Sequence, residues 1–478
     1  MTWYPVIGLE VHIQLDVTSK LFSKSATTYG AKPNSQASFI DLGLPGTLPV
    51  LNKEAITQAV RFGFASDAKV NNEIRFDRKN YFYPDLPKGY QITQHYNPFL
   101  WGGHIDINTK DGNQKRIRIH HTHIEEDAGK SQHAYQDNQT GIDLNRAGIP
   151  LLEVVSEPDL RSADEAVQYL KVLHNLVVFL GICDGNMQEG SMRCDANVSI
   201  RNSPEAPFGT RVEIKNINSF KFVEKAINYE IKRQAEVLTS GGTIKQQTRL
   251  FDETQNITKL MREKEHAHDY RYIPEPDIPP IYIDDETIAA IRKQMPELPK
   301  DKMQRYMKEY DLTAYDAGIL AYDRDYAQFF EALMSQEQPN NSKTTANWLL
   351  GTIAAALNRT NTNLSNSNIN PQQIHILLKR IEEGVISNNI AKTIFEQMWQ
   401  TGEETDTIID KKGLKLINDE SAIMEFIDEV VNNNPKQVTD YKEGNVKLFG
   451  YLVGQCMKIS QGKVDPAQLN KLLKKKLG

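Results

Sequence analysis

Several segments in the N-terminal half alternate strictly between polar and apolar side chains, and this alternation constrains the fold more than any other feature of the sequence. In the segment Val6–Leu15, the polar residues Glu10, His12 and Gln14 are separated by single apolar residues. Successive side chains of a β-strand point to opposite faces, so one face would be polar and the other apolar. The segment is predicted to be a strand, and taken alone it fits the solvent-exposed side of a half-buried sheet.

The same alternation recurs in three further segments. Their polar positions are His121, His123 and Glu125; Arg193, Asp195, Asn197, Ser199 and Arg201; and Arg211, Glu213 and Lys215. Plain solvated faces are usually built from interchangeable Lys, Glu, Thr and Ser. These faces are instead rich in His, Arg, Asn and carboxylates, the residues of metal and phosphate sites. The repetition therefore favours a functional face over a merely solvated one.

Four side chains are candidates to surround a divalent cation, namely Glu10, His12, Glu125 and Glu153. Magnesium prefers oxygen ligands and usually keeps several waters, so the carboxylates suit it better than His12 does. The imidazole can bind through water or act on the substrate instead. Arg193, Lys215 and Lys79 are candidates to neutralise phosphate charge, which together suggests phosphoryl transfer.

Composition excludes several classes of protein. The chain has 478 residues, 39% of them hydrophobic, which predicts two or three domains. Its formal net charge is −6, so nucleic-acid binding would require a local basic patch. The three cysteines lack CxxC spacing, which argues against a disulfide framework or zinc knuckle and indicates the cytosol.

No leader or membrane segment is expected. Glu10 and Asp16 fall where the apolar core of a secretory leader would have to be. The longest apolar stretches, Leu176–Cys183 and Trp348–Leu357, are far shorter than the roughly 20 residues that span a bilayer.

From Ile288 onward the pattern changes to helices. The predicted helices include Asp301–Tyr310, Asp323–Met334, Thr344–Leu357 and Pro371–Glu383, and a last helix begins at Asp465 and Pro466. We therefore predict an α+β protein with three domains, covering residues 1–292, 293–405 and 406–478. The first would hold an antiparallel-rich sheet, and the other two would be all-α.

Some local patterns are decoys. Gly129-Lys130-Ser131 resembles the end of a P-loop, but Ile124 stands where its first glycine should be. His266 and His268 could ligate a metal, although a polar turn is at least as plausible there. The sequence contains neither a glycine- and serine-rich amidase signature nor a glutaminase-type cysteine motif. If the protein uses ammonia from glutamine, another chain must release it.

Eight segments, in order along nearly the whole chain, closely resemble one family, the B subunits of aspartyl/glutamyl-tRNA amidotransferases. They are Ile7–Leu15, Phe76–Lys88, Ile124–Lys130, Asp143–Leu160, Glu189–Asn197, Glu213–Phe220, His268–Asp277 and Gly450–Ser460. Long strings such as KNYFYPDLPK and NRAGIPLLEVVSEPD make the resemblance specific. It implies a cradle-shaped catalytic domain, then a helical domain, then a small helical tail that binds tRNA.

The resemblance also implies an activity. The protein would use ATP and magnesium to phosphorylate the side-chain carboxylate of Glu-tRNA(Gln), Asp-tRNA(Asn) or both, and ammonia would then displace the phosphate. The glutaminase, or A, subunit would supply the ammonia through a tunnel, and the small C subunit would complete a cytoplasmic heterotrimer. By resemblance, His12, Glu125 and Glu153 form the metal-centred catalytic cluster. Nucleotide or phosphate contacts would come from Glu10, Lys79, Arg193, Glu213 and Lys215.

One departure from the family concerns zinc. Many relatives carry a four-cysteine zinc site after the first strand, and the matching positions here are Ser23, Ser25, Ser38 and Asp41. Serine is a poor zinc ligand, so we expect no structural zinc. The flanking Gly43–Gly46 is retained, so we expect the loop to persist under other stabilisation.

Two alternatives remain open at this point. The chain could be a tRNA-binding scaffold whose partner carries the catalysis, or a carboxylate–amine ligase that acts on a small molecule. The helical C-terminal half and its lysine-rich end, Lys471–Leu477, favour a large substrate, although such a lysine run is more often a solvated helix face.

Overall fold

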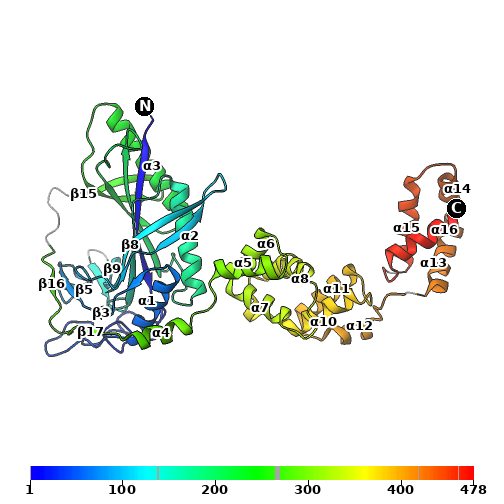
Figure 1. Cartoon of the computed structure of the whole chain (residues 1–478), viewed down its shortest axis with the longest axis horizontal. Helices are drawn as coiled ribbons and strands as arrows, with labels where there is room; N and C mark the ends of the chain where they lie inside the picture. The colour runs from blue at the N-terminus through cyan, green and yellow to red at the C-terminus, as the bar shows by residue number, and fades with distance from the viewer. Residues whose placement is uncertain (1, 137–138, 264–269, 418, 461) are drawn as a thin grey trace. The chain divides into compact units, whose positions relative to one another are not determined.

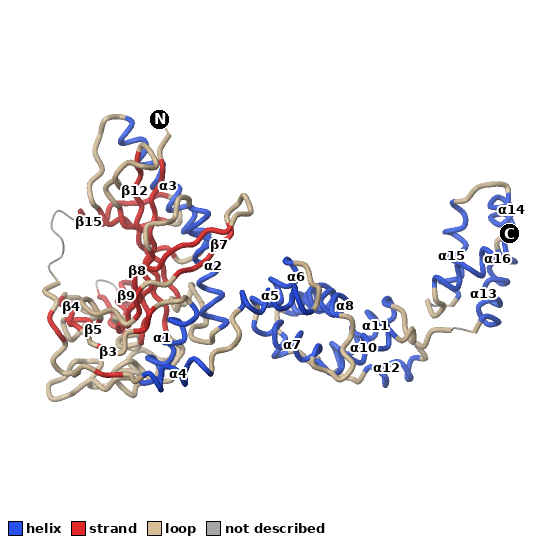
Figure 2. Tube along the Cα trace, in the orientation of Figure 1, coloured by secondary structure: helices blue, strands red, loops and turns tan. Residues whose placement is uncertain are grey.

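The computed structural model describes residues 2–136, 139–263, 270–417, 419–460 and 462–478. The chain forms two compact units, residues 1–298 and 299–478. The first is built on β-sheets, and the second contains only helices and loops in its described part (Figure 1, Figure 2). This organisation confirms the predicted α+β class. Among the described residues, every helix is too short or too polar to cross a lipid bilayer.

Ten strands form the main sheet of the first unit. Their order is β15–β14–β13–β12–β1–β11–β8–β6–β2, with β7 paired to β8. Their bounds are β1 Tyr4–Gln14, β2 Lys69–Val70, β6 Leu100–Trp101, β7 His104–Asn108, β8 Gln114–Glu126, β11 Pro150–Ser156, β12 Met192–Arg201, β13 Val212–Ile217, β14 Gln247–Asp252 and β15 Ile257–Glu263. Strands β13 and β14 run parallel, whereas the other paired strands of the described sheet are antiparallel, as predicted.

The register of four neighbouring strands brings distant parts of the sequence together. His12 of β1 lies opposite Glu153 of β11 on one side and Arg193 of β12 on the other. Glu153 in turn lies opposite His123 of β8. Polar residues of β1, β8, β11 and β12 therefore meet near the middle of the sheet.

The apolar positions of β1 enter the main core of the first unit. Val11 and Ile13 are completely buried, and they belong to a hydrophobic cluster that includes residues of three helices, α1 (Lys53–Ala65), α2 (Ala163–Phe179) and α3 (Phe220–Thr239). Helices α2 and α3 begin at the N-cap residues Ser162 and Ser219, whose side chains accept hydrogen bonds from backbone N–H groups of the first turn. One face of β1 is thus committed to packing, which leaves its other face for polar groups.

Three small sheets accompany the main one. Strand β4 (Asp77–Asn80) pairs with β5 (Tyr90–Thr93) and with β16 (Ile273–Pro274). The other two sheets pair β3 (Glu73–Ile74) with β17 (Ile281–Tyr282), and β9 (Lys130–Gln136) with β10 (Gln139–Asp143). Helix α4 (Asp285–Lys293) follows β17 and contacts α1. The sheet that contains β4 and β16 matters for the site, because it joins residues near 80 to residues near 272.

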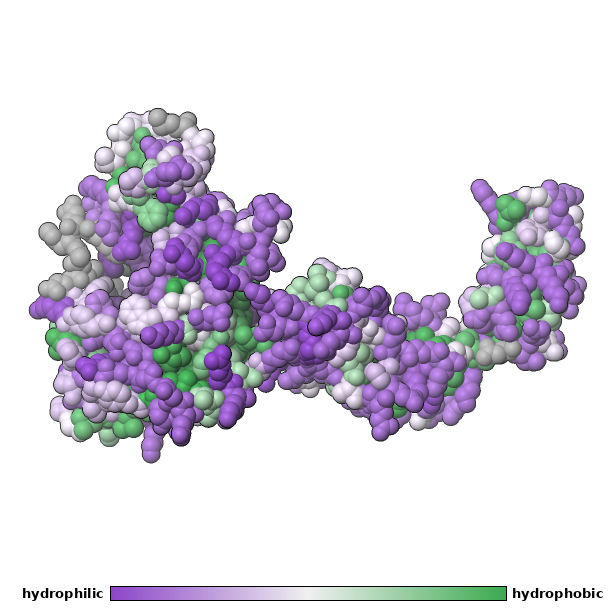
Figure 3. Space-filling view, in the orientation of Figure 1, coloured by the Kyte–Doolittle hydropathy of each residue, from purple (hydrophilic) through white to green (hydrophobic). Residues whose placement is uncertain are grey.

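The second unit consists of short helices. Their bounds are α5 Pro299–Glu309, α6 Ala314–Tyr322, α7 Arg324–Met334, α8 Ser342–Asn347, η1 Trp348–Ile353, α9 Ala354–Thr360, η2 Leu364–Asn366, α10 Pro371–Glu382, α11 Asn388–Thr401, α12 Thr405–Lys412, α13 Glu420–Asn433, α14 Pro435–Lys442, α15 Lys447–Ile459 and α16 Pro466–Leu477. Two separate hydrophobic clusters lie within it, one from Tyr306 to Ile409 and one from Ile423 to Leu477. In the view of Figure 3 the surface over these helices is mostly hydrophilic, as expected when their apolar residues fill the two cores.

The helix ends follow the predicted signals, but one predicted helix is not uniform. Asn370 and Gln373 form a reciprocal capping box at the start of α10, and Asp465 caps α16. The predicted helix Thr344–Leu357 is interrupted by a π-helical stretch, η1, whose residues Trp348 and Leu349 are buried. Such wide turns depend on packing around the helix, which the residue pattern does not specify.

Candidate functional site

The predicted catalytic cluster is assembled from three strands. His12 Nε2 lies 3.1 Å from Glu153 Oε2 and 3.5 Å from Glu125 Oε1. One ligand atom from each residue lies within 4.8 Å of the other two, which is close enough for one cation to contact all three. The side chain of Glu125 is 4% exposed, so its negative charge requires a nearby cation or proton. The three residues are chemically suited to hold a divalent metal ion.

The carboxylates and imidazoles of this cluster strongly shift each other's pKa. Burial by itself would raise the pKa of Glu153, but the positive charges of His123 and His12 lower it to about 2. Burial likewise opposes ionisation of Glu125, whereas hydrogen bonds from His12 and His123 hold its pKa well below the usual range. For His12, burial disfavours the charged form, but Glu153 raises the pKa to about 10. Without a metal ion, ionised carboxylates therefore face protonated imidazoles.

His123 supports the cluster from the neighbouring strand, although it was not among the predicted site residues. Its Nε2 lies 3.5 Å from Glu125 Oε2 and 3.5 Å from Glu153 Oε2. Thr93 Oγ1 donates a 3.0 Å hydrogen bond to Glu125 Oε2, so that carboxylate is held from several sides. The shared face of His121, His123 and Glu125 was the sequence signal for His123, but alternation alone does not show which residues touch.

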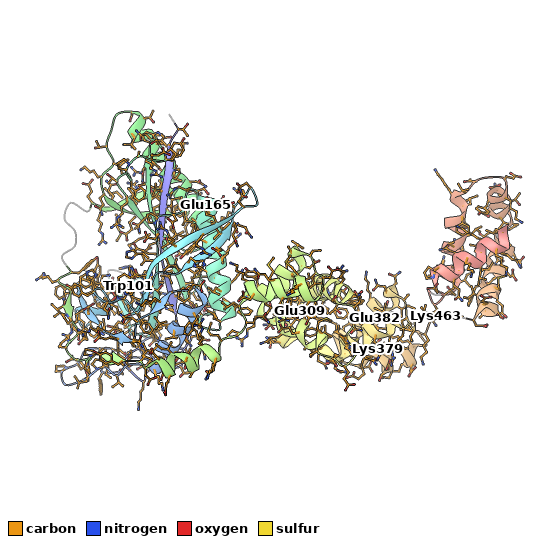
Figure 4. All side chains as sticks on the ribbon, viewed as in Figure 1. Trp101, Glu165, Glu309, Lys379, Glu382 and Lys463 are labelled. Atoms are coloured by element: carbon orange, nitrogen blue, oxygen red, sulfur yellow. The ribbon has the colours of Figure 1, made fainter. Side chains whose placement is uncertain are left out.

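A row of rings continues from His123 along the same part of the sheet. The His121 ring stacks on His123 with a centroid separation of 5.3 Å, and Trp101 lies 6.1 Å from His121. Trp101, labelled in Figure 4, is 41% exposed and belongs to β6 beside β8. The polar face therefore also carries aromatic surface.

A second acidic cluster lies beside the first. Ligand atoms of Glu10, Asp195 and Glu213 also lie within 4.8 Å of one another. Lys215 Nζ contacts Asp195 and lies 2.9 Å from Glu213 Oε1, while Asn197 donates a 2.8 Å hydrogen bond to Glu10. Burial and then the charge of Glu153 raise the pKa of Glu10, so the two clusters interact electrostatically. This group contains predicted contacts from β1 and β13, together with Asp195, which the prediction missed.

A hollow of about 260 Å³ opens next to the second cluster and shares Glu10 and Asn197 with it. Its other lining residues include Gly8, Pro158, Phe208 and Arg211. Phe208 is 57% exposed, so an apolar ring is available on the wall of a hollow that is lined by both polar and apolar residues. A hollow of this composition can accept a planar, partly apolar group close to carboxylates.

The remaining predicted basic residues differ in their partners. Arg193 donates a 2.8 Å hydrogen bond to Asp127, which also accepts a 3.3 Å bond from Gln14. Lys79 lies instead over aromatic rings, and it forms no ion pair with a carboxylate in the described part of the chain. Burial opposes its charge, but Glu125 and other nearby groups raise its pKa, so Lys79 lies within electrostatic range of the first cluster. All eight predicted site residues therefore surround one region of the sheet.

A separate buried charge cluster occupies the loop that lacks the cysteines. Lys20 Nζ lies 3.4 Å from Asp41 Oδ2, and the two side chains are 0% and 3% exposed. Ser23 Oγ and Ser38 Oγ each donate a 2.9 Å hydrogen bond to Asp41, and the Ser25 backbone N–H donates to Ser23 Oγ. We call this set of Lys20, Ser23, Ser38 and Asp41 the loop staple. The other proposed metal pair, His266 and His268, lies outside the described residues.

Two family models and several known proteins match this chain over most of its length. Residues 5–289 match the family model of the GatB/GatE catalytic domain, and residues 328–477 match that of the GatB domain. The chain is 54% identical to the B subunit of the aspartyl/glutamyl-tRNA(Asn/Gln) amidotransferase of Nitrosococcus oceani over 477 residues, and the match covers 100% of both chains. It is 53% identical to the same protein of Coxiella burnetii, and 54% identical to that of Alkalilimnicola ehrlichii, again over 100% of both chains.

Proposed function

Because this chain belongs to the GatB/GatE family, whose matched relatives are B subunits of aspartyl/glutamyl-tRNA(Asn/Gln) amidotransferases, we propose that it amidates misacylated tRNA. Its substrates are Glu-tRNA(Gln), Asp-tRNA(Asn) or both. A side-chain carboxylate oxygen attacks the γ-phosphorus of ATP, which releases ADP and forms an acyl phosphate. Ammonia then attacks the acyl carbon, and inorganic phosphate leaves with the former carboxylate oxygen. The enzyme is thus an ATP-dependent ligase that forms a carbon–nitrogen bond.

The observation that carries this proposal is the convergence of His12, Glu125 and Glu153 beside the cluster of Glu10 and its neighbours. Two anions, the γ-phosphate and the substrate carboxylate, must approach each other, and their repulsion must be screened. His12, Glu125 and Glu153 would hold Mg²⁺, which supplies positive charge to the phosphoryl oxygens when bound. The buried carboxylates with low pKa fit such a cation, because they are ionised at neutral pH.

The nucleotide would occupy the second part of the site. The hollow of about 260 Å³ is wide enough for a planar base, and Phe208 offers a ring against which a base can pack. Glu10 and Glu213 lie where they can bind the nucleotide through a cation, and Lys215 can contact a phosphate. Arg193 and Lys79 flank the first cluster and would neutralise charge on the transferred phosphoryl group.

Other chains would complete the enzyme. We propose a cytoplasmic heterotrimer with the glutaminase, or A, subunit and the small C subunit, since this chain carries no recognised amidase signature. Ammonia would reach the acyl phosphate through a tunnel, so the intermediate is kept from water. The helical tail, residues 406–478, would bind the tRNA, and the lysines of α16 would contact its backbone.

We also propose that the N-terminal loop folds without zinc. In the loop staple, the ammonium of Lys20 already supplies a buried positive charge to Asp41. The hydroxyls of Ser23 and Ser38 donate hydrogen bonds to Asp41 Oδ1 and Oδ2, and the staple contains no thiolate or imidazole that could bind zinc.

The test supplies purified chain with Glu-tRNA(Gln), ATP, Mg²⁺ and ammonium chloride, and measures Gln-tRNA formation with and without the other two proteins of the heterotrimer. We expect ATP-dependent amide from the chain with ammonium alone, or from the complete assembly. His12→Ala should abolish amide formation but retain tRNA binding, which would exclude a pure scaffold. Amidation of free glutamate in place of the tRNA ester would instead favour a small-molecule ligase.

A further inference from the structure

Lys79 is bound differently from the other basic residues of the site. Arg193 and Lys215 each contact carboxylates of this chain, so much of their charge is already neutralised. The ammonium of Lys79 lies instead 4.9 Å from the ring centroid of Tyr270 and 5.7 Å from that of Tyr81. An aromatic face attracts a cation through its quadrupole and adds no net negative charge. Lys79 therefore keeps a full positive charge for an external anion.

The two rings hold this ammonium from different parts of the chain. Tyr81 directly follows β4, whereas Tyr270 precedes β16, which pairs with β4. The ring centroids are 6.1 Å apart and their planes are inclined by 73°, so the rings form two walls rather than one stack. We call Tyr81 and Tyr270 the tyrosine clamp.

Backbone contacts fix the Tyr270 side of the clamp. The Asn80 backbone N–H donates a 2.9 Å hydrogen bond to the Tyr270 carbonyl, and Asn80 Nδ2 donates a 2.6 Å bond to the Arg271 carbonyl. One residue further on, the Tyr272 ring stacks on His95 at 3.9 Å with an interplanar angle of 7°. The backbone is thus anchored at and beyond Tyr270 by contacts that do not involve Lys79.

We propose that Tyr81 and Tyr270 are positioning residues, which hold the ammonium of Lys79 unneutralised beside Glu125 and Glu153 so that it binds the phosphoryl group during transfer. This inference rests on the proposed function. A carboxylate in place of the rings would hold the ammonium more tightly, but it would also cancel the charge needed by the incoming phosphate. The clamp resolves that conflict, because its attraction does not compete with the anion for hydrogen bonds.

The experiment compares Tyr270→Phe, which keeps the ring, with Tyr270→Leu, which removes it, in the complete amidotransferase. Gln-tRNA formation is measured with ATP varied at saturating tRNA, and with tRNA varied at saturating ATP. We expect Tyr270→Phe to stay within about twofold of the wild type, and Tyr270→Leu to lower kcat about tenfold with little change in the KM for tRNA. Tyr81→Phe and Tyr81→Leu repeat the comparison in case Tyr270→Leu fails to fold, as judged by thermal unfolding. The control, Tyr29→Leu, alters a ring that is 69% exposed and lies outside these contacts, and it should leave kcat unchanged.

A double-mutant cycle distinguishes positioning of Lys79 from a general structural role of Tyr270. If the clamp acts through Lys79, Tyr270→Leu adds no further loss in a Lys79→Met background. A full tenfold loss in that background would overturn the inference, as would equal losses from Tyr270→Phe and Tyr270→Leu. Failure of the wild-type assembly to form amide would instead reject the proposed function, so the two failures are distinguishable.

Discussion

Two regions of the first unit bury carboxylates against cations, and they do so in opposite ways. In the catalytic cluster, Glu125 and Glu153 face imidazoles, which can release a proton and make room for a metal ion. In the loop staple, Asp41 faces the ammonium of Lys20, which is fully buried and also donates a 3.2 Å hydrogen bond to the Leu144 carbonyl. The comparison shows that the kind of counter-cation decides whether a buried carboxylate serves chemistry or stability. An exchangeable cation gives a site for chemistry, and a fixed one gives a structural bond.

The largest expected effect is a loss of activity when the catalytic cluster is altered, with a smaller effect on stability. Glu125→Gln should lower the rate of amide formation about a thousandfold, because the metal and phosphoryl group lose a buried anionic ligand. The loss of stability should be smaller than the roughly 3–5 kcal/mol expected when a buried ion pair loses one partner, since the imidazoles can release protons when a carboxylate charge is removed. Both properties are measured on one preparation, with Glu54→Gln as the control, because the side chain of Glu54 is 53% exposed at the start of α1. A large loss of stability would contradict the distinction between the two regions.

A substitution in the loop staple should instead have its main effect on stability. Lys20→Met leaves Asp41 buried without its cation, and we expect the loop to lose about 3–5 kcal/mol of local stability. Hydrogen exchange of the amides between residues 20 and 50 measures this change. Lys110→Met removes an ion pair whose lysine is 77% exposed, and it should change exchange by less than about 0.5 kcal/mol. Equal effects of the two variants would show that the buried pair is not special.

The stability of the metal-free protein should depend on pH through His12 and Glu153. His12 has a pKa raised to about 10, so its contribution to the stability of the metal-free protein is fully present below its ordinary pKa of 6.5. That contribution is lost as pH rises toward 10. The lowered pKa of Glu153 acts at the other end, and its contribution is lost as pH falls from 4.5 through about 2.

The affinity for a metal ion should depend on the protonation of His12. The ion must displace the proton of His12, so the affinity for Mn²⁺, as a probe for Mg²⁺, should rise about tenfold per pH unit between pH 7 and 9. Electron paramagnetic resonance of free Mn²⁺ measures this, and His12→Asn should flatten the profile. An equally steep profile in His12→Asn would assign the proton to another group.

The smallest effect is expected from chelation. Excess EDTA should shift the unfolding temperature of the protein as purified by less than about 1 °C, because we propose that the loop folds without zinc. Replacing Ser23, Ser25, Ser38 and Asp41 by cysteine should create a zinc site only when Lys20 is also replaced by a small neutral residue. Stoichiometric zinc in the unmodified protein would contradict this prediction directly.

The sequence predicted which residues share one face of a strand better than it predicted which of them are in contact. Strict alternation placed Glu10 and His12 on one face of a strand, and the structure has them on β1 as expected. His123 and Asp195 were visible in the same alternating segments, but a period of two does not show which strands are neighbours. The register of β8, β11, β1 and β12 supplies that information, and it depends on contacts far apart in the sequence.

The loop staple shows the same limit. The absence of cysteines in the loop was evident, and so was Asp41 at the last of the four positions. Its partner Lys20 precedes the loop and carries no local signal, since lysine is usually exposed. Likewise, the tyrosine clamp joins residues near 80 and 270 through the pairing of β4 with β16, a pairing too short to predict from two residues.

The loop staple has a consequence for the conditions under which the protein can be made. A cysteine-ligated loop acquires its shape only when the cell can spare a zinc ion for it. Here the positive charge is encoded in the polypeptide as Lys20, and it reaches Asp41 as soon as the strand β1 and the loop come together. If the loop folds without zinc, as we propose, we expect new molecules to mature during zinc starvation, when ribosomes still need charged tRNA.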